Sequence, residues 1–226
     1  MLRNRPLIFL LLLAAVAPVA FAQMDFTAAR RDLAVGSTPR TIAAGDLNGD
    51  GKQDLAVVAG SSNAVSILLN VGGGVFRAAA QVPTGDSPNA AVLARFNSDA
   101  FPDMAVATYL AGQVQIYPGN GSGGFLAPTS ISTGPGSGPW ALAVLDWNQD
   151  TRNDLAVLLY GTGRYRLYTG NGAGGFSLQA EYPVERGPVA VTAGDWNGDL
   201  LADVAIVSEG DPAVVPPPNG TVTVAY

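Results

Sequence analysis

The chain has 226 residues, a formal net charge of −6, and neither cysteine nor histidine. Disulfides, thiolate metal sites and catalytic groups built on cysteine or histidine are therefore excluded. The acidic balance argues against a nucleic-acid partner, because nucleic-acid binding needs a basic surface. The 28 glycines and the low share of charged residues, 13%, favour an all-β fold rich in turns.

Residues 1–22 have the pattern of a secretory signal peptide. Two arginines precede an apolar run over residues 7–16, and Ala20-Phe21-Ala22 fits the small-x-small cleavage pattern, which makes Gln23 the expected start of the mature chain. The alternative is a membrane anchor, but the apolar run is shorter than the ~20 residues that a span needs. We therefore expect a secreted protein, extracellular, periplasmic or on the cell surface, with no membrane span after cleavage.

Four prolines mark an internal repeat with spacings of 49, 51 and 49 residues: Pro39, Pro88, Pro139 and Pro188. Each is followed by a short apolar segment, a polar loop, an apolar run and an alternating run. In the first three repeats a further segment follows, which opens with Phe76, Phe125 or Phe176. A period of this length indicates a repeat architecture. Four short antiparallel strands in each repeat indicate the blades of a β-propeller.

We therefore predict an all-β protein with a β-propeller over residues 23–226, whose repeats lie near 37–85, 86–136, 137–185 and 186–226. The segment 24–35 matches the fourth strand of a repeat, so it is a candidate to complete the last blade and close a four-bladed ring. The alternative is a fragment of a longer propeller, for example one with seven blades.

The loop between the first and second strands of each repeat carries the candidate chemistry. We call residues 46–54, 95–103, 146–154 and 195–203 the first to fourth loops. Positions 1, 3, 5 and 9 of the first, third and fourth loops hold carboxylate or amide oxygens, the donors that Ca²⁺ prefers, and the backbone carbonyl at position 7 is a natural fifth donor. The sequence predicts about three Ca²⁺ ions, held by Asp46, Asn48, Asp50, Lys52, Asp54, Asp146, Asn148, Asp150, Arg152, Asp154, Asp195, Asn197, Asp199, Leu201 and Asp203.

Other interpretations of these loops remain open. An EF-hand requires glutamate at position 12, where the first loop has Val57. The loops are also compatible with purely structural Asx turns, in which the side-chain oxygens accept hydrogen bonds from the loop's own backbone. Thr151 and Leu200 replace the turn glycine of the first loop, Gly51, so the tight turn is less favourable there.

The second loop differs because Arg95 stands at position 1, where a guanidinium cannot coordinate a cation. We predict that this loop binds no metal. One interpretation is that Arg95 forms ion pairs with Asp99 and Asp103 and so replaces the cation. The alternative is that Arg95 points to solvent.

The pattern Asp-x-Asn-x-Asp-Gly-x-x-Asp-Leu-Ala-Val, followed by a glycine-rich turn and a phenylalanine, resembles the FG-GAP or VCBS repeat over residues 26–226. That repeat builds the propeller of integrin α-subunits and of many bacterial secreted proteins. The resemblance implies calcium in the loops and a secreted interaction role. Members of the family most often have seven blades, whereas four are recognisable here.

We expect no enzyme activity, because most carboxylates belong to the loops and no phosphate-binding glycine motif opens a helix. The favoured function is a protein-interaction or adhesion module for a protein or cell-surface ligand, and the alternative is a carbohydrate-binding propeller of lectin type. No exposed aromatic residue recurs in every repeat, as a lectin of this kind would require. Trp147 and Trp196, at position 2 of their loops, are expected to pack between blades. The proline-rich segment 209–220 is a candidate stiff docking loop.

Overall fold

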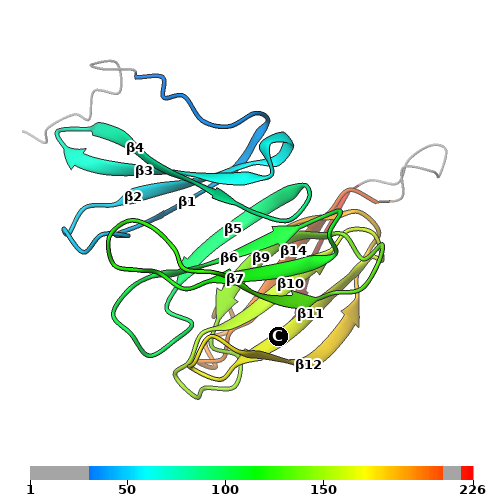
Figure 1. Cartoon of the computed structure of the whole chain (residues 1–226). Coiled ribbons are helices and arrows are strands. Elements are labelled where there is room, and N and C mark those ends of the chain that lie inside the picture. Colours follow the sequence, from blue (N-terminus) through cyan, green and yellow to red (C-terminus); the bar gives the residue numbers. More distant parts are fainter. Residues whose placement is uncertain (1–30, 211–219, 226) are drawn as a thin grey trace, which may run out of the picture. The chain divides into compact units, whose positions relative to one another are not determined.

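The structure is a computed structural model that describes residues 31–210 and 220–225. The predicted signal peptide at 1–22 and residues 211–219 of the proline-rich segment 209–220 lie outside the described residues. The chain divides into a unit of residues 1–32 and a compact unit of residues 33–226, which holds every described strand (Figure 1). No helix of the described residues has the length and apolar character needed to cross a membrane.

The second unit is built from four antiparallel sheets, each formed by strands that are consecutive in the chain. The first three sheets have four strands each and the described part of the fourth has three, which confirms the predicted β-propeller blades. The strands are β1 (Pro39–Gly45), β2 (Asp54–Ala59), β3 (Ala64–Gly72) and β4 (Val75–Pro83); β5 (Pro88–Ala94), β6 (Asp103–Thr108), β7 (Gln113–Tyr117) and β8 (Thr129–Ser132); β9 (Pro139–Leu145), β10 (Asp154–Leu159), β11 (Arg164–Gly170) and β12 (Phe176–Pro183); and β13 (Pro188–Gly194), β14 (Asp203–Ser208) and β15 (Thr221–Ala225). One short 3-10 helix, η1 (Gly60–Ser62), joins β2 to β3.

Two details differ from the predicted strands. Phe125 does not open the fourth strand of the second blade: it forms an isolated bridge with Gly119, and β8 begins only at Thr129. In the predicted closing segment 24–35, residues 31–35 are not in a strand, and the rest lies outside the described residues. The described part of the fourth sheet ends at β15, which pairs with β14.

The second strand of each blade is the most buried, as its unbroken apolar run predicts. All six residues of β6 and of β10 are buried, because these strands lie inside a sheet and that sheet lies between two others. The third strand of the second blade, β7, alternates instead: Val114 and Ile116 are buried, while Gln113 and Gln115 next to them are partly exposed. The predicted alternation is not seen in β3, whose first six residues are all buried.

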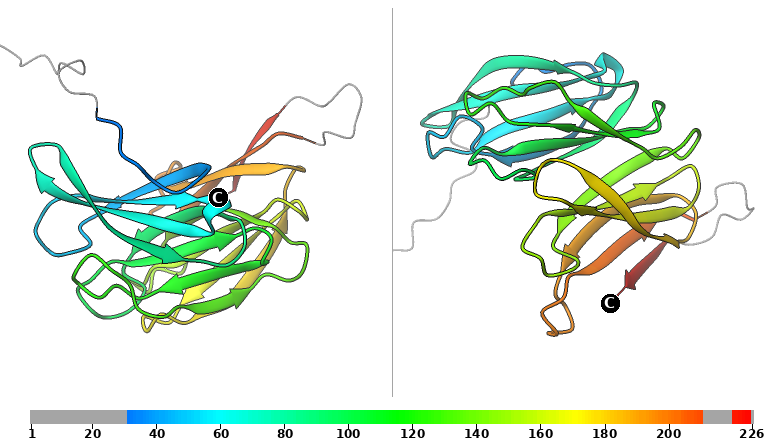
Figure 2. Two further views of the ribbon diagram at one scale, coloured as in Figure 1. Left: turned by 45° about the horizontal axis from the view of Figure 1, so that its top comes forward. Right: turned by 60° about the horizontal axis from the view of Figure 1, so that its bottom comes forward.

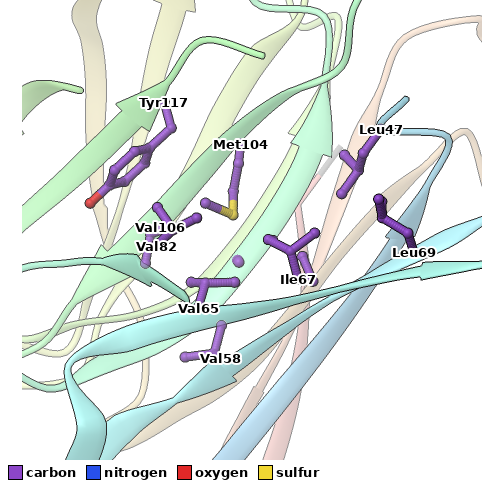
Figure 3. Close-up of a cluster of buried hydrophobic side chains, with 11 residues drawn as sticks. Leu47, Val58, Val65, Ile67, Leu69, Val82, Met104, Val106 and Tyr117 are labelled. Carbon is purple, nitrogen blue, oxygen red and sulfur yellow. The ribbon is translucent and has the colours of Figure 1, made fainter. Parts of the chain in front are cut away.

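Three clusters of buried apolar side chains join the described blades in chain order. Figure 3 shows the first cluster, in which Val58, Val65 and Ile67 of the first blade face Met104 and Tyr117 of the second. Burying one such side chain stabilises the fold by about 1.5–3 kcal/mol. Figure 2 shows the resulting arrangement from two further sides, with each sheet beside the next along the chain.

The last described sheet has one face without a neighbouring blade. Val207 of β14 and Val222 of β15 are 42% and 69% exposed, although the equivalent strands of the inner blades are largely buried. The difference follows from position in the array, because burial of these strands comes from the next sheet.

Candidate functional site

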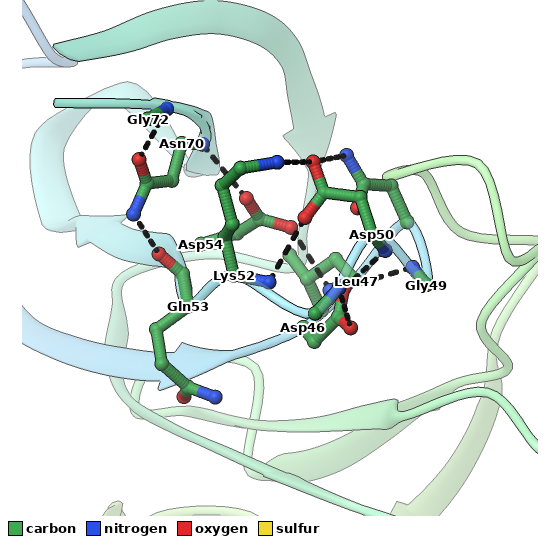
Figure 4. Close-up of polar contacts among 11 residues, drawn as sticks. Asp46, Leu47, Gly49, Asp50, Lys52, Gln53, Asp54, Asn70 and Gly72 are labelled. Carbon is green, nitrogen blue, oxygen red and sulfur yellow. Dashed lines mark hydrogen bonds and ion pairs between the residues drawn. The ribbon is translucent and has the colours of Figure 1, made fainter.

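The carboxylate at position 1 closes the first loop. Asp46 Oδ1 accepts hydrogen bonds from Gly49 N (2.8 Å) and Asp50 N (3.1 Å), and Asp46 Oδ2 accepts one from Gly51 N (2.8 Å), as Figure 4 shows in part. Gly49 and Gly51 have φ of 75° and 80°, a region that favours glycine. One carboxylate therefore collects three successive backbone donors of a tight turn.

Positions 3 and 5 of the first loop make Asx turns. Asn48 Oδ1 accepts from Asp50 N (3.0 Å), and Asp50 Oδ1 accepts from Lys52 N (2.9 Å). Lys52 Nζ also lies 2.9 Å from Asp50 Oδ2. This hydrogen bond from the Lys52 ammonium lowers the pKa of Asp50. The hydrogen bonds of the structural Asx-turn interpretation are thus present in the loop.

Position 9 is buried and its carboxylate accepts hydrogen bonds from two separate segments. Asp54 is 0% exposed. Its Oδ2 accepts from Leu47 N (2.9 Å) at the start of the loop, and its Oδ1 accepts from Asn70 N (2.8 Å) at the end of β3. Asp54 therefore ties the loop to the third strand of its own blade.

The same arrangement recurs at position 9 of every loop. Asp103, Asp154 and Asp203 are each 1% exposed. Each accepts a hydrogen bond from the backbone N–H of position 2, and the first two also accept one from the residue 16 positions further on. The Oδ1 of Asp203 is the exception, because it has no hydrogen-bond partner in the described part of the chain.

The third and fourth loops keep the turn of the first despite less favourable residues. Thr151 and Leu200, at the position of Gly51, have φ of 66° and 69°. A non-glycine residue in this region costs on the order of 1–3 kcal/mol, and it persists only where the surroundings impose it. Asp146 Oδ2 accepts from Thr151 N (2.9 Å) and Asp195 Oδ2 from Leu200 N (3.0 Å), so the position 1 carboxylate imposes the turn in both loops.

In the first, third and fourth loops the side-chain oxygens at positions 1, 3 and 5 therefore accept hydrogen bonds from the backbone of their own loop, while the carboxylate at position 9 is drawn into the blade. The donors are carboxylate and amide oxygens, the chemistry that a hard cation requires. An ionised carboxylate has about four acceptor sites, so oxygens that accept from N–H groups retain lone pairs. Within residues 31–210 and 220–225, no three acidic side chains are gathered as a metal cluster.

The second loop corrects one expectation. Arg95 is exposed and forms no ion pair with Asp99 or Asp103 in the described structure. Asp103 is buried and instead accepts from Phe96 N (2.8 Å), Asn97 N (3.1 Å) and Gly119 N (2.9 Å). The predicted replacement of the cation by Arg95 was wrong, because backbone N–H groups already occupy acceptor sites of the buried Asp103 carboxylate, which the guanidinium was expected to reach.

The first and second loops also contact the next blade. Gly123 N donates to Leu47 O (2.9 Å), and Gly174 N donates to Phe96 O (2.8 Å). The position 2 side chains Leu47 and Phe96 are 3% and 2% exposed. Trp147 packs against the third cluster, which confirms its predicted role between blades.

Position 2 of the fourth loop, in the last described blade, behaves differently. Trp196 is 50% exposed. Its indole ring lies beside the backbone of Gly194, at which an added Cβ would be 3.1 Å from the ring. The expected packing of Trp196 between two blades is therefore not seen in the described residues.

Three aromatic side chains, Tyr109, Trp140 and Tyr160, lie at the strand ends opposite to those that carry the acidic loops. The Trp140 ring centroid is 5.6 Å from that of Tyr109 and 4.8 Å from that of Tyr160, and the Arg40 guanidinium lies 5.8 Å from the Trp140 centroid. These rings cover one another and belong to two blades only, so they do not form a platform repeated around the fold.

A hydrogen-bonded chain across three blades was missed from the sequence. Arg40 Nη1 donates to Asn89 Oδ1 (2.9 Å), and Asn89 Nδ2 donates to Trp140 O (2.8 Å). All three residues directly follow a repeat proline. This shared position in the repeat was the sequence feature from which their contact could have been predicted.

The fold and the loops together define a repeat β-propeller with an acidic loop after the first strand of each blade. An FG-GAP-like repeat model matches residues 46–106, 95–157 and 146–206, and the chain belongs to this family. The propeller fold of this family is generally a non-catalytic interaction module. No curated protein matches the chain.

Solved structures support the fold. The chain is similar to a protein from Lactobacillus plantarum, with 18% identity and a TM-score of 0.54, covering 86% of this chain and 57% of that one. It is also similar to BBS1N in a complex with ARL6DN, with 17% identity and a TM-score of 0.56, covering 77% and 52%. The chain thus spans about half the length of these structures, and the likeness concerns the fold alone.

Proposed function

We propose that this protein is a secreted, calcium-binding β-propeller that acts as a protein-interaction module. One observation carries the calcium part: three loops hold the same carboxylate–amide–carboxylate set in the same backbone conformation, even where Thr151 and Leu200 are unfavourable in it. Strain that recurs at equivalent positions indicates a functional constraint. The leader-like sequence of residues 1–22 supports secretion, and family membership supports an interaction role.

The proposed ions are held by the oxygens at positions 1, 3 and 5 of the first, third and fourth loops, with the position 7 carbonyl and the position 9 carboxylate as further donors. Calcium would neutralise the acidic loops and connect their turns. Asp50 and Asp150 already have cationic neighbours, at 2.9 Å from Lys52 and 3.6 Å from Arg152. The fourth loop has the uncharged Leu201 at position 7, so neutralisation of its carboxylates depends most on the proposed ion.

Calorimetric titration of the mature chain tests the proposal, with about three Ca²⁺ ions expected. Asp50→Asn removes one of them, because it keeps an acceptor for Lys52 N but deletes a charged donor. Asp86→Asn is the matched control, since Asp86 is exposed and accepts from Asn63 Nδ2 (3.2 Å) outside the loops. The control is expected to leave the stoichiometry unchanged.

The melting temperature provides an independent measurement. A ligand at a hundredfold excess over its Kd stabilises the folded state by ~2.7 kcal/mol per site, which is about 5–11 °C for a domain of this size. EGTA is expected to lower the melting temperature accordingly. An unchanged melt together with no titration heat contradicts the calcium part, and a secreted protein that does not begin at Gln23 contradicts the cleavage site.

A further inference from the structure

A cavity of about 490 Å³ lies between the second and third loops and has a cationic lining. Its two charged lining residues are Arg95 of the second loop and Arg152 of the third, and none of the described residues that line it is acidic. The other lining residues carry amide or hydroxyl groups, apart from one glycine. This polar and basic hollow stands out on a chain whose net charge is −6.

The two guanidinium groups are available to a ligand. Arg95 is exposed and has no ion pair in the described structure. The Arg152 side chain is 54% exposed, and its Nη1 lies 3.6 Å from Asp150 Oδ2, a length at which an exposed pair contributes little. A guanidinium donates through a planar fork that matches the two oxygens of a carboxylate.

Hydrogen bonds fix the frame of the cavity. Asn153 Nδ2 donates to Arg95 O (2.9 Å), which ties the second loop to the third. Asn171 Oδ1 accepts from Ala173 N (2.8 Å) and Gly175 N (2.9 Å). Since its oxygen is engaged twice, the orientation of the Asn171 amide is set, and its NH₂ group is the part left for a ligand.

We propose that this cavity binds a single carboxylate, supplied by a glutamate or aspartate side chain of a protein partner. Arg95 and Arg152 would hold the carboxylate oxygens and the Asn171 amide would add a neutral donor. The neighbouring Asp150 and the acidic chain disfavour doubly charged phosphate and densely sulfated glycans more strongly than one carboxylate. The choice of a protein as the source rests on the proposed interaction function, whereas the site itself does not depend on calcium.

An NMR titration of the mature chain tests this proposal. The probe is acetyl-Gly-Glu-Gly-amide, compared with its glutamine counterpart, inorganic sulfate and a sulfated tetrasaccharide. The glutamate peptide is expected to shift the backbone amide signals of Ser98, Asn153 and Asn171, and the glutamine peptide is not. Arg95→Gln and Arg152→Gln each remove a charge-assisted contact and are expected to weaken binding about tenfold.

Arg77→Gln is the matched control, because Arg77 is exposed on β4 of the first blade and the substitution changes the net charge equally. It is expected to leave peptide binding unchanged. An equal loss in this variant, equal binding of the glutamine peptide, tighter binding of sulfate or of the tetrasaccharide, or no shift at all each overturns the proposal. If the chain binds the peptide but no calcium, the proposed calcium function is contradicted and the carboxylate site is supported. If it binds calcium but not the peptide, the carboxylate site is contradicted and the calcium function is supported.

Discussion

Asp103, at position 9 of the second loop, tests how the loops are held. It is 1% exposed. Its oxygens accept from Phe96 N, Asn97 N and Gly119 N at 2.8, 3.1 and 2.9 Å, and from Asn97 Nδ2 at 3.3 Å. Asp103→Asn preserves the shape but replaces one acceptor oxygen with an NH₂ group, which then faces other N–H donors.

The expected loss follows from two effects. A hydrogen bond to a charged acceptor contributes about 1.5–3 kcal/mol, and a buried donor left unsatisfied costs about 1–3 kcal/mol. With partial rearrangement of the loop, we expect Asp103→Asn to lower the free energy of unfolding by about 3–5 kcal/mol, a large part of the 5–15 kcal/mol typical of a domain. The melting temperature is then expected to fall by roughly 6–20 °C.

Urea unfolding followed by tryptophan fluorescence measures this loss, with an unchanged m value as the check that only stability has altered. Asp99→Asn is the matched control, since Asp99 is exposed and its Oδ1 accepts from Phe101 N (2.8 Å), which an amide oxygen can also do. We expect the control to stay within ~0.5 kcal/mol of the parent. Since the second loop is predicted to bind no metal, the loss is expected to be equal in calcium and in EGTA. A loss below ~1 kcal/mol, or one as large in the control, would refute the structural role of position 9.

Two further predictions concern pH. Burial raises the pKa of Tyr117 to about 12 from an ordinary value of 10.0, so this group adds stability below pH 10 that is lost as the pH rises through the folded pKa. Tyr117→Phe is expected to lower the free energy of unfolding by about 1 kcal/mol at neutral pH, because the hydrogen bond to Pro83 O is lost. In urea unfolding at alkaline pH this difference from the parent is expected to shrink, and a constant difference would count against the assignment. The hydrogen bond from Arg166, with Arg164 nearby, lowers the pKa of Glu181 from its ordinary value of 4.5. The stability that the ionised Glu181 contributes is therefore present above pH 4.5 and is lost as the pH falls through the lower folded pKa. Glu181→Gln is expected to make the free energy of unfolding less dependent on pH in this acid range, and an unchanged dependence would contradict the pairing.

The blades were predictable because their signals are local. The run Met104-Ala105-Val106-Ala107 is apolar throughout, and burial on both faces follows directly from that pattern. The alternation of β7 and the period of the four prolines are equally visible in the chain. The start of β8 was not predictable, because Phe125 pairs with Gly119 as an isolated bridge before the regular strand begins.

The candidate site was predictable in composition but not in geometry. The acidic pattern identified which residues form the loops, yet it did not show that Asp54 and Asp103 turn inward. Their partners are backbone N–H groups, such as Asn70 N and Gly119 N, which are positioned by strand register and have no signature in the sequence. The expected ion pair from Arg95 failed for the same reason, since side-chain charges are visible in a sequence and backbone donors are not.

The second loop separates what the fold requires from what a cation would require. It has lost the carboxylate at position 1, where Arg95 stands, but it retains the buried Asp103 and the Asx turns at positions 3 and 5. Its blade nevertheless pairs β5 with β6 in the same register as the other blades pair their first two strands. Position 9 is therefore the carboxylate that this fold needs in every repeat. Position 1 is dispensable for the blade. We propose that its carboxylate in the first, third and fourth loops serves the calcium ion, which would account for the unfavourable turn at Thr151 and Leu200 in two of these loops.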